Sequence, residues 1–182
     1  MVLIVRRLLP AACLTALACA APAWIPPARA GQPDRLAIGG GYYDVVRQWR
    51  PAADIRMEYR SGWSLIPITE PFFSISPWGG LEIGTRGSVW GGGGLTLNMP
   101  LTQHLVFSPG VGIGVYGQGK GRNLGSPLEF REQVEVGWEF DDQTRLAGAL
   151  SHTSNAGAAH RNGGVESAVL YYEVPLWGHT HP

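Results

Sequence analysis

The segment of residues 126–140, SPLEFREQVEVGWEF, decides the fold class because its apolar and charged side chains alternate. Every second residue from Leu128 to Phe140 is apolar except Glu132, and most residues between them are charged. A hydrophobic period of two predicts a β-strand with one apolar and one polar face. A charged second face is typical of a small membrane barrel, whose strands face lipid outside and a polar lumen inside.

Two further segments show the same alternation. Residues 103–117 carry an apolar row opposite serine and glycine, and residues 52–60 carry Ile55, Met57 and Tyr59 opposite Asp54, Arg56, Glu58 and Arg60. A soluble lipocalin-like barrel would hold its apolar row inside, and the alternation alone does not separate the two alternatives. Charged neighbours such as Arg56 and Glu58 favour the polar lumen, since buried charges without partners are costly.

Strand-like runs separated by turn signals recur along the whole chain. We predict eight strands, at residues 35–46, 52–60, 71–85, 88–98, 103–117, 126–140, 143–154 and 165–177. Their even number and their lengths predict an all-β fold, an eight-stranded antiparallel transmembrane β-barrel. Aromatic residues near the strand ends are predicted to lie at the membrane interfaces, namely Trp63, Trp78, Trp90, Trp138 and Trp177.

The ends of the chain differ from the predicted barrel. Residues 1–30 have the basic start, the apolar run and the small-residue cleavage site of a signal peptide. The two cysteines, Cys13 and Cys19, lie in this segment, so the mature chain would hold no disulfide; Cys19 also leaves a lipoprotein alternative open. The barrel is expected over residues 31–177, with a tail at 178–182. The net charge of zero gives no indication of a nucleic-acid partner.

Polar residues end two of the predicted lipid-facing rows. In the strand at 143–154 the row that holds the leucines continues with His152 and Ser154, and in the strand at 165–177 the lipid-facing row begins with Glu166. Antiparallel neighbours bring these ends together, so the three side chains are predicted to converge outside the barrel wall. A hydroxyl becomes a strong nucleophile beside a base, and the base is oriented by a third group.

The motif HTSNAG at residues 152–157, followed by NGGVE at residues 162–166, resembles the pattern of the outer-membrane lipid A 3-O-deacylases, the PagL family. The resemblance covers the C-terminal third well and the rest loosely. It implies that Ser154 is the nucleophile, His152 its base and Glu166 the orienting carboxylate. It also implies that Asn155 supports the oxyanion and that Asn162 has a structural or site-shaping role, with no metal or cofactor.

The same resemblance implies a substrate and a location. The substrate would be lipid A or lipopolysaccharide, cleaved at the ester-linked 3-hydroxyacyl chain of position 3. The protein would lie among the lipids of the bacterial outer membrane, with its active site on the outer-leaflet side. The oligomeric state stays open, a homodimer included.

Two alternatives remain at this point. Glu132 breaks the lipid-facing row of its strand, and one register places it opposite His152, so it competes with Glu166 as the third group. The barrel could also be non-catalytic, with a structural or adhesive role like OmpA or OmpX, or it could act as an outer-membrane phospholipase or acyltransferase. Only the enzymes require a nucleophile that faces lipid.

Overall fold

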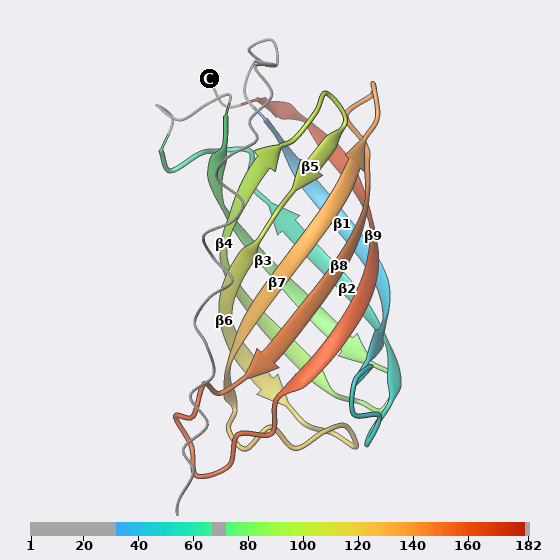
Figure 1. Ribbon diagram of the computed structural model, residues 1–182, viewed down its shortest axis with the longest axis vertical. Helices are drawn as coiled ribbons and strands as arrows, with labels where there is room; N and C mark the ends of the chain where they lie inside the picture. Colours follow the sequence, from blue (N-terminus) through green and yellow to red (C-terminus); the bar gives the residue numbers. More distant parts are fainter. Residues whose placement is uncertain (1–31, 67–71, 181–182) are drawn as a thin grey trace, which may run out of the picture.

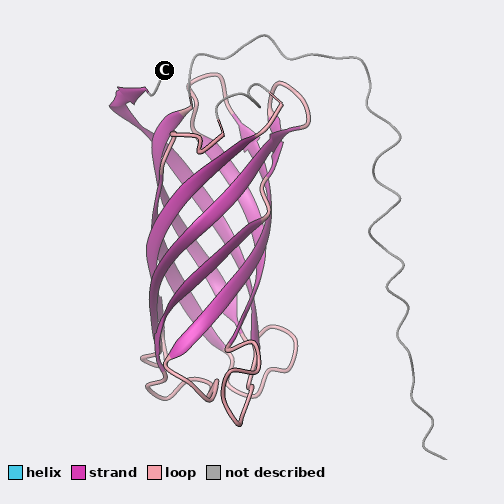
Figure 2. Ribbon diagram, turned by 90° about the vertical axis from the view of Figure 1, so that its left-hand side faces the viewer, coloured by secondary structure: helices cyan, strands magenta, loops and turns pink. Residues whose placement is uncertain are grey.

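The computed structural model describes residues 32–66 and 72–180, so the predicted signal peptide at 1–30 lies outside the described residues. The described chain forms one antiparallel sheet that closes into a tilted barrel (Figures 1 and 2). Its strands in chain order are β1 (Pro33–Tyr43), β2 (Ala52–Arg60), β3 (Ser74–Gly84), β4 (Val89–Pro100), β5 (Leu105–Phe107), β6 (Gly110–Gly117), β7 (Leu128–Glu139), β8 (Arg145–Ser154) and β9 (Val165–Thr180). Among these residues no helix is long and apolar enough to cross a membrane.

The barrel has eight strand positions although nine strands are labelled. Both β5 and β6 pair with β4 on one side and with β7 on the other, so they share one position. They are separated at Ser108 and Pro109, and Pro109 has no N–H group to donate to a neighbouring strand. The sheet closes because β1 pairs with both β2 and β9. The predicted eight-stranded antiparallel barrel is therefore confirmed.

The two faces of the wall have opposite character, as predicted. Large apolar side chains are exposed along the outer face, among them Ile38, Ile55, Met57, Leu81, Val111, Ile113, Val134, Val136, Leu150 and Leu170. Charged side chains are buried in the lumen, among them Arg35, Asp54, Arg56, Glu58, Glu82, Glu129, Arg131, Glu135, Glu139, Arg145 and Glu173. This polarity is that of a barrel with a lipid-facing exterior, and it is opposite to that of a lipocalin.

Ion pairs hold the lumen charges together. The Arg60 guanidinium lies 2.8 Å from carboxylate oxygens of Glu58, Glu135 and Glu173. Arg56 Nε lies 3.1 Å from Asp54 Oδ2 and 3.0 Å from Glu82 Oε2. Because buried charges need partners, this network accounts for the charged inward rows of β2 and β7.

The sequence prediction is wrong for two of the aromatic residues, Trp78 and Trp90, which lie on the lumen side of the wall. Trp90 does not lie at a membrane interface; it is 1% exposed and stacks inside the barrel against Trp78, with ring centroids 6.0 Å apart. Glycines of β4 and β6 leave room for the Trp90 ring, since a Cβ atom on Gly92 or Gly114 would lie 2.8 Å or 2.5 Å from it. Trp63 and Trp138 are exposed, in keeping with an interfacial position.

The two ends of the barrel carry different connections. The connections 44–51, 85–88, 118–127 and 155–164 lie together at one end, which we call the loop end (Figure 1, lower end). The described residues 61–66 and 72–73 and the connections at 101–104 and 140–144 lie at the opposite end, together with the start of β1 and the end of β9. Strand β9 runs to Thr180, three residues beyond the expected end of the barrel at Trp177.

Candidate active site

The outer row of β8 ends in the polar residues that the sequence singled out. His152 and Ser154 are half-buried on the outer face, whereas their neighbours Ser151 and Thr153 are buried in the lumen. Glu166 begins the outer row of β9 and stands directly opposite His152 in the strand register. The barrel therefore brings His152, Ser154 and Glu166 together on its outer face at the loop end.

His152 and Glu166 contact one another. Nδ1 of His152 lies 3.3 Å from Oε1 of Glu166, and 42% and 27% of the two side chains are exposed. The second carboxylate oxygen of Glu166 is buried and, among the described residues, has no hydrogen-bond partner. A carboxylate at Nδ1 leaves Nε2 as the imidazole nitrogen that faces away from it, which is the arrangement a histidine base requires.

The loop before β9 passes close to both the Nε2 edge of the His152 imidazole and the side chain of Ser154. A Cβ atom built on Gly164 would lie 2.8 Å from Cε1 and 3.2 Å from Nε2 of His152, and 3.8 Å from Cβ of Ser154. Nε2 and the Ser154 side chain are thus both within 4 Å of one point. Gly164 was not identified from the sequence, because a glycine inside a loop gives no indication of what it approaches.

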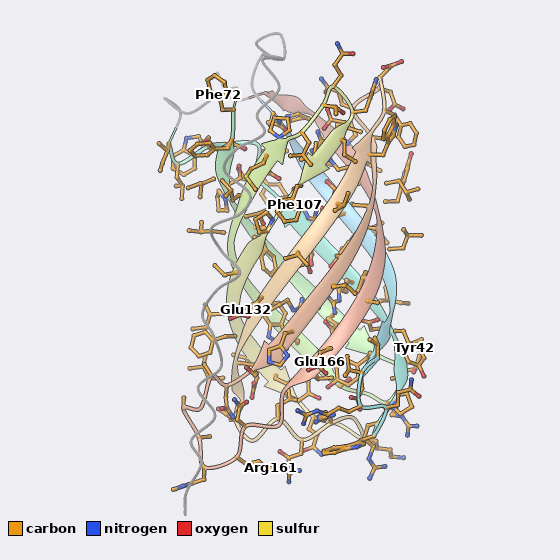
Figure 3. All side chains as sticks on the ribbon, viewed as in Figure 1. Tyr42, Phe72, Phe107, Glu132, Arg161 and Glu166 are labelled. Carbon is orange, nitrogen blue, oxygen red and sulfur yellow. The ribbon has the colours of Figure 1, made fainter. Side chains whose placement is uncertain are left out.

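Glu132 lies on the other side of His152. In the register of β7 and β8 it pairs with His152, as the alternative reading of the sequence required, while Phe130 pairs with Ser154. Glu132 is exposed on the outer face (Figure 3), and the ion-pair contact of the imidazole is with Glu166. Two carboxylates therefore flank the histidine in the wall, and the contact at Nδ1 favours Glu166 as the group that orients it.

Asn155 fixes the loop that follows β8. Its side chain is fully buried, and its Nδ2 donates to the carbonyl oxygens of Leu124 at 2.9 Å and Arg161 at 2.7 Å. Its Oδ1 accepts a 3.0 Å hydrogen bond from the N–H of Gly157. Both side-chain donors are thus used within the protein, where they hold the loop to its own far end and to the connection at 118–127.

A tight turn follows Asn155. Ala156 and Gly157 both have positive φ angles, 53° and 82°, and Ala158 donates its N–H to the Asn155 carbonyl at 2.9 Å. Positive φ at both central residues is the conformation of a type I′ turn.

Asn162, further along the same loop, is exposed. The structure therefore places it near the site without giving its side chain a role in the packing.

An apolar groove runs along the outer wall from the site. Near His152 it holds about 420 Å³ and is lined by Val45, Val46, Val134 and Leu150 as well as by both carboxylates. A second hollow of about 560 Å³ shares Val134 and Leu150 and continues over β7, β8 and β9. Glycines at positions 40 and 148 form part of its floor, where an added Cβ atom would meet open space. Because its lining is largely apolar, the groove is suited to a hydrocarbon chain.

Fold and site together define a small outer-membrane β-barrel that carries a histidine–carboxylate pair and a serine on its lipid-facing side. The family model of the lipid A 3-O-deacylases (PagL) matches residues 32–175. The chain therefore belongs to the PagL family, and it is an outer-membrane barrel.

Individual relatives agree with this assignment. The lipid A deacylase PagL of Bordetella bronchiseptica is 24% identical over 160 residues, which cover 86% of this chain and 89% of that protein. The PagL protein of Pseudomonas aeruginosa is 32% identical over 69 residues, 37% of this chain and 40% of that protein. A crystal structure of the outer membrane enzyme PagL superimposes with a TM-score of 0.62 at 19% identity, over 78% of this chain and 99% of that one.

Proposed function

We propose that this protein is a serine hydrolase that removes the ester-linked 3-hydroxyacyl chain from position 3 of lipid A in the outer leaflet. The observation that carries the proposal is the 3.3 Å contact between His152 and Glu166, with Ser154 next on the same outer row. Membership of the deacylase family supports the substrate, and the pairing of hydroxyl, imidazole and carboxylate supports the serine mechanism.

In the proposed mechanism Ser154 Oγ attacks the ester carbonyl while His152 Nε2 accepts its proton. Glu166 holds the imidazole through Nδ1 and stabilises the cation that forms. The tetrahedral intermediate collapses to an acyl-enzyme as His152 returns the proton to the sugar hydroxyl that leaves. Water, deprotonated by His152, then releases the 3-hydroxy fatty acid. No step of this sequence uses a metal or cofactor.

The developing oxyanion needs hydrogen-bond donors. The side chain of Asn155 already donates twice to backbone carbonyls, so the backbone N–H that follows Ser154 is the better donor. Asn162 is exposed beside the site and is the second residue that we assign to shaping it. One such donor contributes on the order of 3 kcal/mol to the transition state in comparable enzymes.

The position of the site explains how a lipid would reach it. The lumen is filled with ion pairs, whereas the apolar groove opens on the outer face beside His152. A lipid can therefore approach sideways within the membrane, with its acyl chain in the groove and its ester at the level of Ser154. An adhesive or purely structural barrel has no need of this arrangement.

The test is deacylation of lipid A in detergent by the purified, refolded mature chain with a chelator present. We expect mass spectrometry to show loss of one 3-hydroxyacyl chain, and Ser154→Ala or His152→Ala to abolish that loss while each barrel still folds. Full activity of Ser154→Ala would refute the nucleophile. Cleavage of phospholipid with intact lipid A would instead identify a phospholipase.

A further inference from the structure

A basic pocket of about 440 Å³ lies between the connections of the loop end, apart from the catalytic side chains. The described residues that line it include no carboxylate and five cationic side chains: Arg50, Arg86, Lys120, Arg122 and Arg161. Over the four connections of this end the sequence holds six arginines or lysines and one acidic residue, Asp44. Five cations around one cavity repel one another, so the pocket favours an anion.

Arg122 is the buried member of the pocket. It is 4% exposed; its Nη1 lies 2.8 Å from Asp44 Oδ1, and its Nε donates to the Gly163 carbonyl at 2.6 Å. Its guanidinium carbon lies 4.5 Å from the Trp49 ring, which also lines the pocket. Nη2 is buried and has no hydrogen-bond partner among the described residues. A buried donor left without an acceptor is unfavourable, and an anion in the pocket would supply the acceptor.

The connections that form the pocket are held to one another by hydrogen bonds. Arg86 donates from Nε to the carbonyl of Pro51 at 2.7 Å and accepts from the N–H of Lys120 at 2.9 Å. The carbonyl of Arg161 accepts from Asn155 at 2.7 Å. The cationic side chains therefore project from a preorganised backbone, which reduces the entropic cost of binding.

The pocket and the catalytic residues share a segment of chain. Arg161 lines the pocket, Gly163 binds Arg122 through its carbonyl, and Gly164 lies against the His152 ring. Figure 3 shows Arg161 at the loop end, beyond Glu132 and Glu166 on the barrel wall. A ligand in the pocket would thus lie on the loop side of the catalytic residues, whereas the apolar groove runs away on the other side.

We propose that this pocket binds a phosphate group of the lipid A substrate while its ester lies at Ser154. Guanidinium groups bind phosphate through paired, charge-assisted hydrogen bonds, and lipid A is a phosphorylated glycolipid with apolar chains. An amphiphile of this kind matches a cationic pocket on one side of the cleavage site and an apolar groove on the other. This inference rests on the proposed function, because it assigns the headgroup of the same substrate.

The test compares lipid A with the same lipid A after chemical removal of its phosphates, using the refolded mature chain. Lys120→Gln and Arg161→Gln each remove one exposed pocket cation, and Arg47→Gln, outside the pocket on the same end, is the matched control. We expect each pocket variant to raise KM for phosphorylated lipid A about fivefold, with kcat within twofold of wild type. The pocket variants should leave KM for the dephosphorylated lipid A unchanged, and the control variant should leave KM unchanged for both lipids.

A binding measurement separates this inference from the proposed function. The Ser154→Ala protein should bind phosphorylated lipid A more tightly than stripped lipid A, whether or not the wild type cleaves either. Inorganic phosphate alone should compete only weakly. The proposal would be overturned if phosphorylated and stripped lipid A bound equally well, or if the pocket variants raised KM equally for both lipids. Strong competition by inorganic phosphate together with equal binding of the two lipids would identify a site for free phosphate instead.

Discussion

The backbone of Gly164 lies against the imidazole of His152, so closely that a Cβ atom at 164 would stand 2.8 Å from Cε1. Contacts this short do not occur between a real Cβ and a ring, so either the ring or the loop would have to move. Because the same Cβ would lie 3.8 Å from Cβ of Ser154, any movement would alter the space between base and hydroxyl. The absence of a side chain at 164 is therefore a condition for the present geometry of the site.

The first prediction concerns this glycine. Gly164→Ala should lower kcat for lipid A about tenfold to a hundredfold, because a displacement of about 1 Å in a reacting group has an effect of that size. Gly79→Ala on β3 is the control, since its added Cβ would be 3.6 Å from the nearest atom, an ordinary contact. Both proteins should refold, as judged by circular dichroism. Wild-type kcat in Gly164→Ala would show that the imidazole is not constrained by this loop.

The second prediction decides between the two carboxylates that flank His152. Glu166→Ala should lower kcat by about two to four orders of magnitude, since the base loses the group that fixes its tautomer. Glu132→Ala, which removes an exposed carboxylate from the neighbouring strand, should cost less than about tenfold. Rates are measured from released 3-hydroxy fatty acid. The reverse order of effects would transfer the orienting role to Glu132.

The sequence predicts the barrel well because the membrane imposes a simple rule on each strand. Charged residues such as Arg56 and Glu135 must face the lumen, and Val134 and Leu150 then face the lipid, so strand parity together with the charged residues assigns the two faces. Trp90 breaks the rule, because indole is apolar enough for the interface and also fits inside the barrel. Its inward position depends on Gly92, two residues further along β4, and on Gly114 of the neighbouring strand β6. Gly114 is distant in the sequence, so the local pattern around Trp90 does not show that the ring has room inside the barrel.

The outer row that holds the proposed catalytic residues could be predicted for the same reason. The loops that surround it could not be predicted. Strand parity and antiparallel pairing place Glu166 opposite His152 on one side, and they place Glu132 opposite His152 on the other side. Which carboxylate contacts the ring depends on side-chain rotamers. The burial of Asn155 and of Arg122 depends on how four connections pack together, and sequence periodicity carries no information about loops.

The third prediction concerns the loop that Asn155 holds. Asn155→Ala removes two hydrogen bonds within the segment 155–164 and one that joins this segment to Leu124 of the connection at 118–127, so the segment should become less ordered. We expect proteolysis in these loops to become at least about tenfold faster, because loops held by few contacts open most readily, and activity to fall with it. Asn155→Asp keeps the acceptor for Gly157 but not the donors and should behave like Asn155→Ala. Unchanged proteolysis with lost activity would point to a direct role of the side chain in catalysis.

The fourth prediction concerns the ion pairs of the lumen, which hold the wall on which the site is built. Arg56 is 1% exposed, pairs with Asp54 and Glu82, and donates to Ser151 Oγ at 3.1 Å, next to His152 in β8. Arg56→Ala would leave buried carboxylates without this partner, and removing one member of a buried pair typically costs about 3–5 kcal/mol. The free energy of unfolding should therefore fall by about this amount in urea titrations followed by tryptophan fluorescence.

A surface arginine provides the comparison for this prediction. Arg47 lies in an exposed connection, so Arg47→Ala removes the same charge without uncovering a buried carboxylate and should change stability by less than about 0.5 kcal/mol. Because Ser151 and His152 are adjacent, Arg56→Ala should also lower activity in conditions where the barrel is still folded. Equal stability of the two variants would mean that water entering the lumen solvates Asp54 and Glu82 as well as Arg56 does, and that the buried network contributes little to holding the catalytic wall.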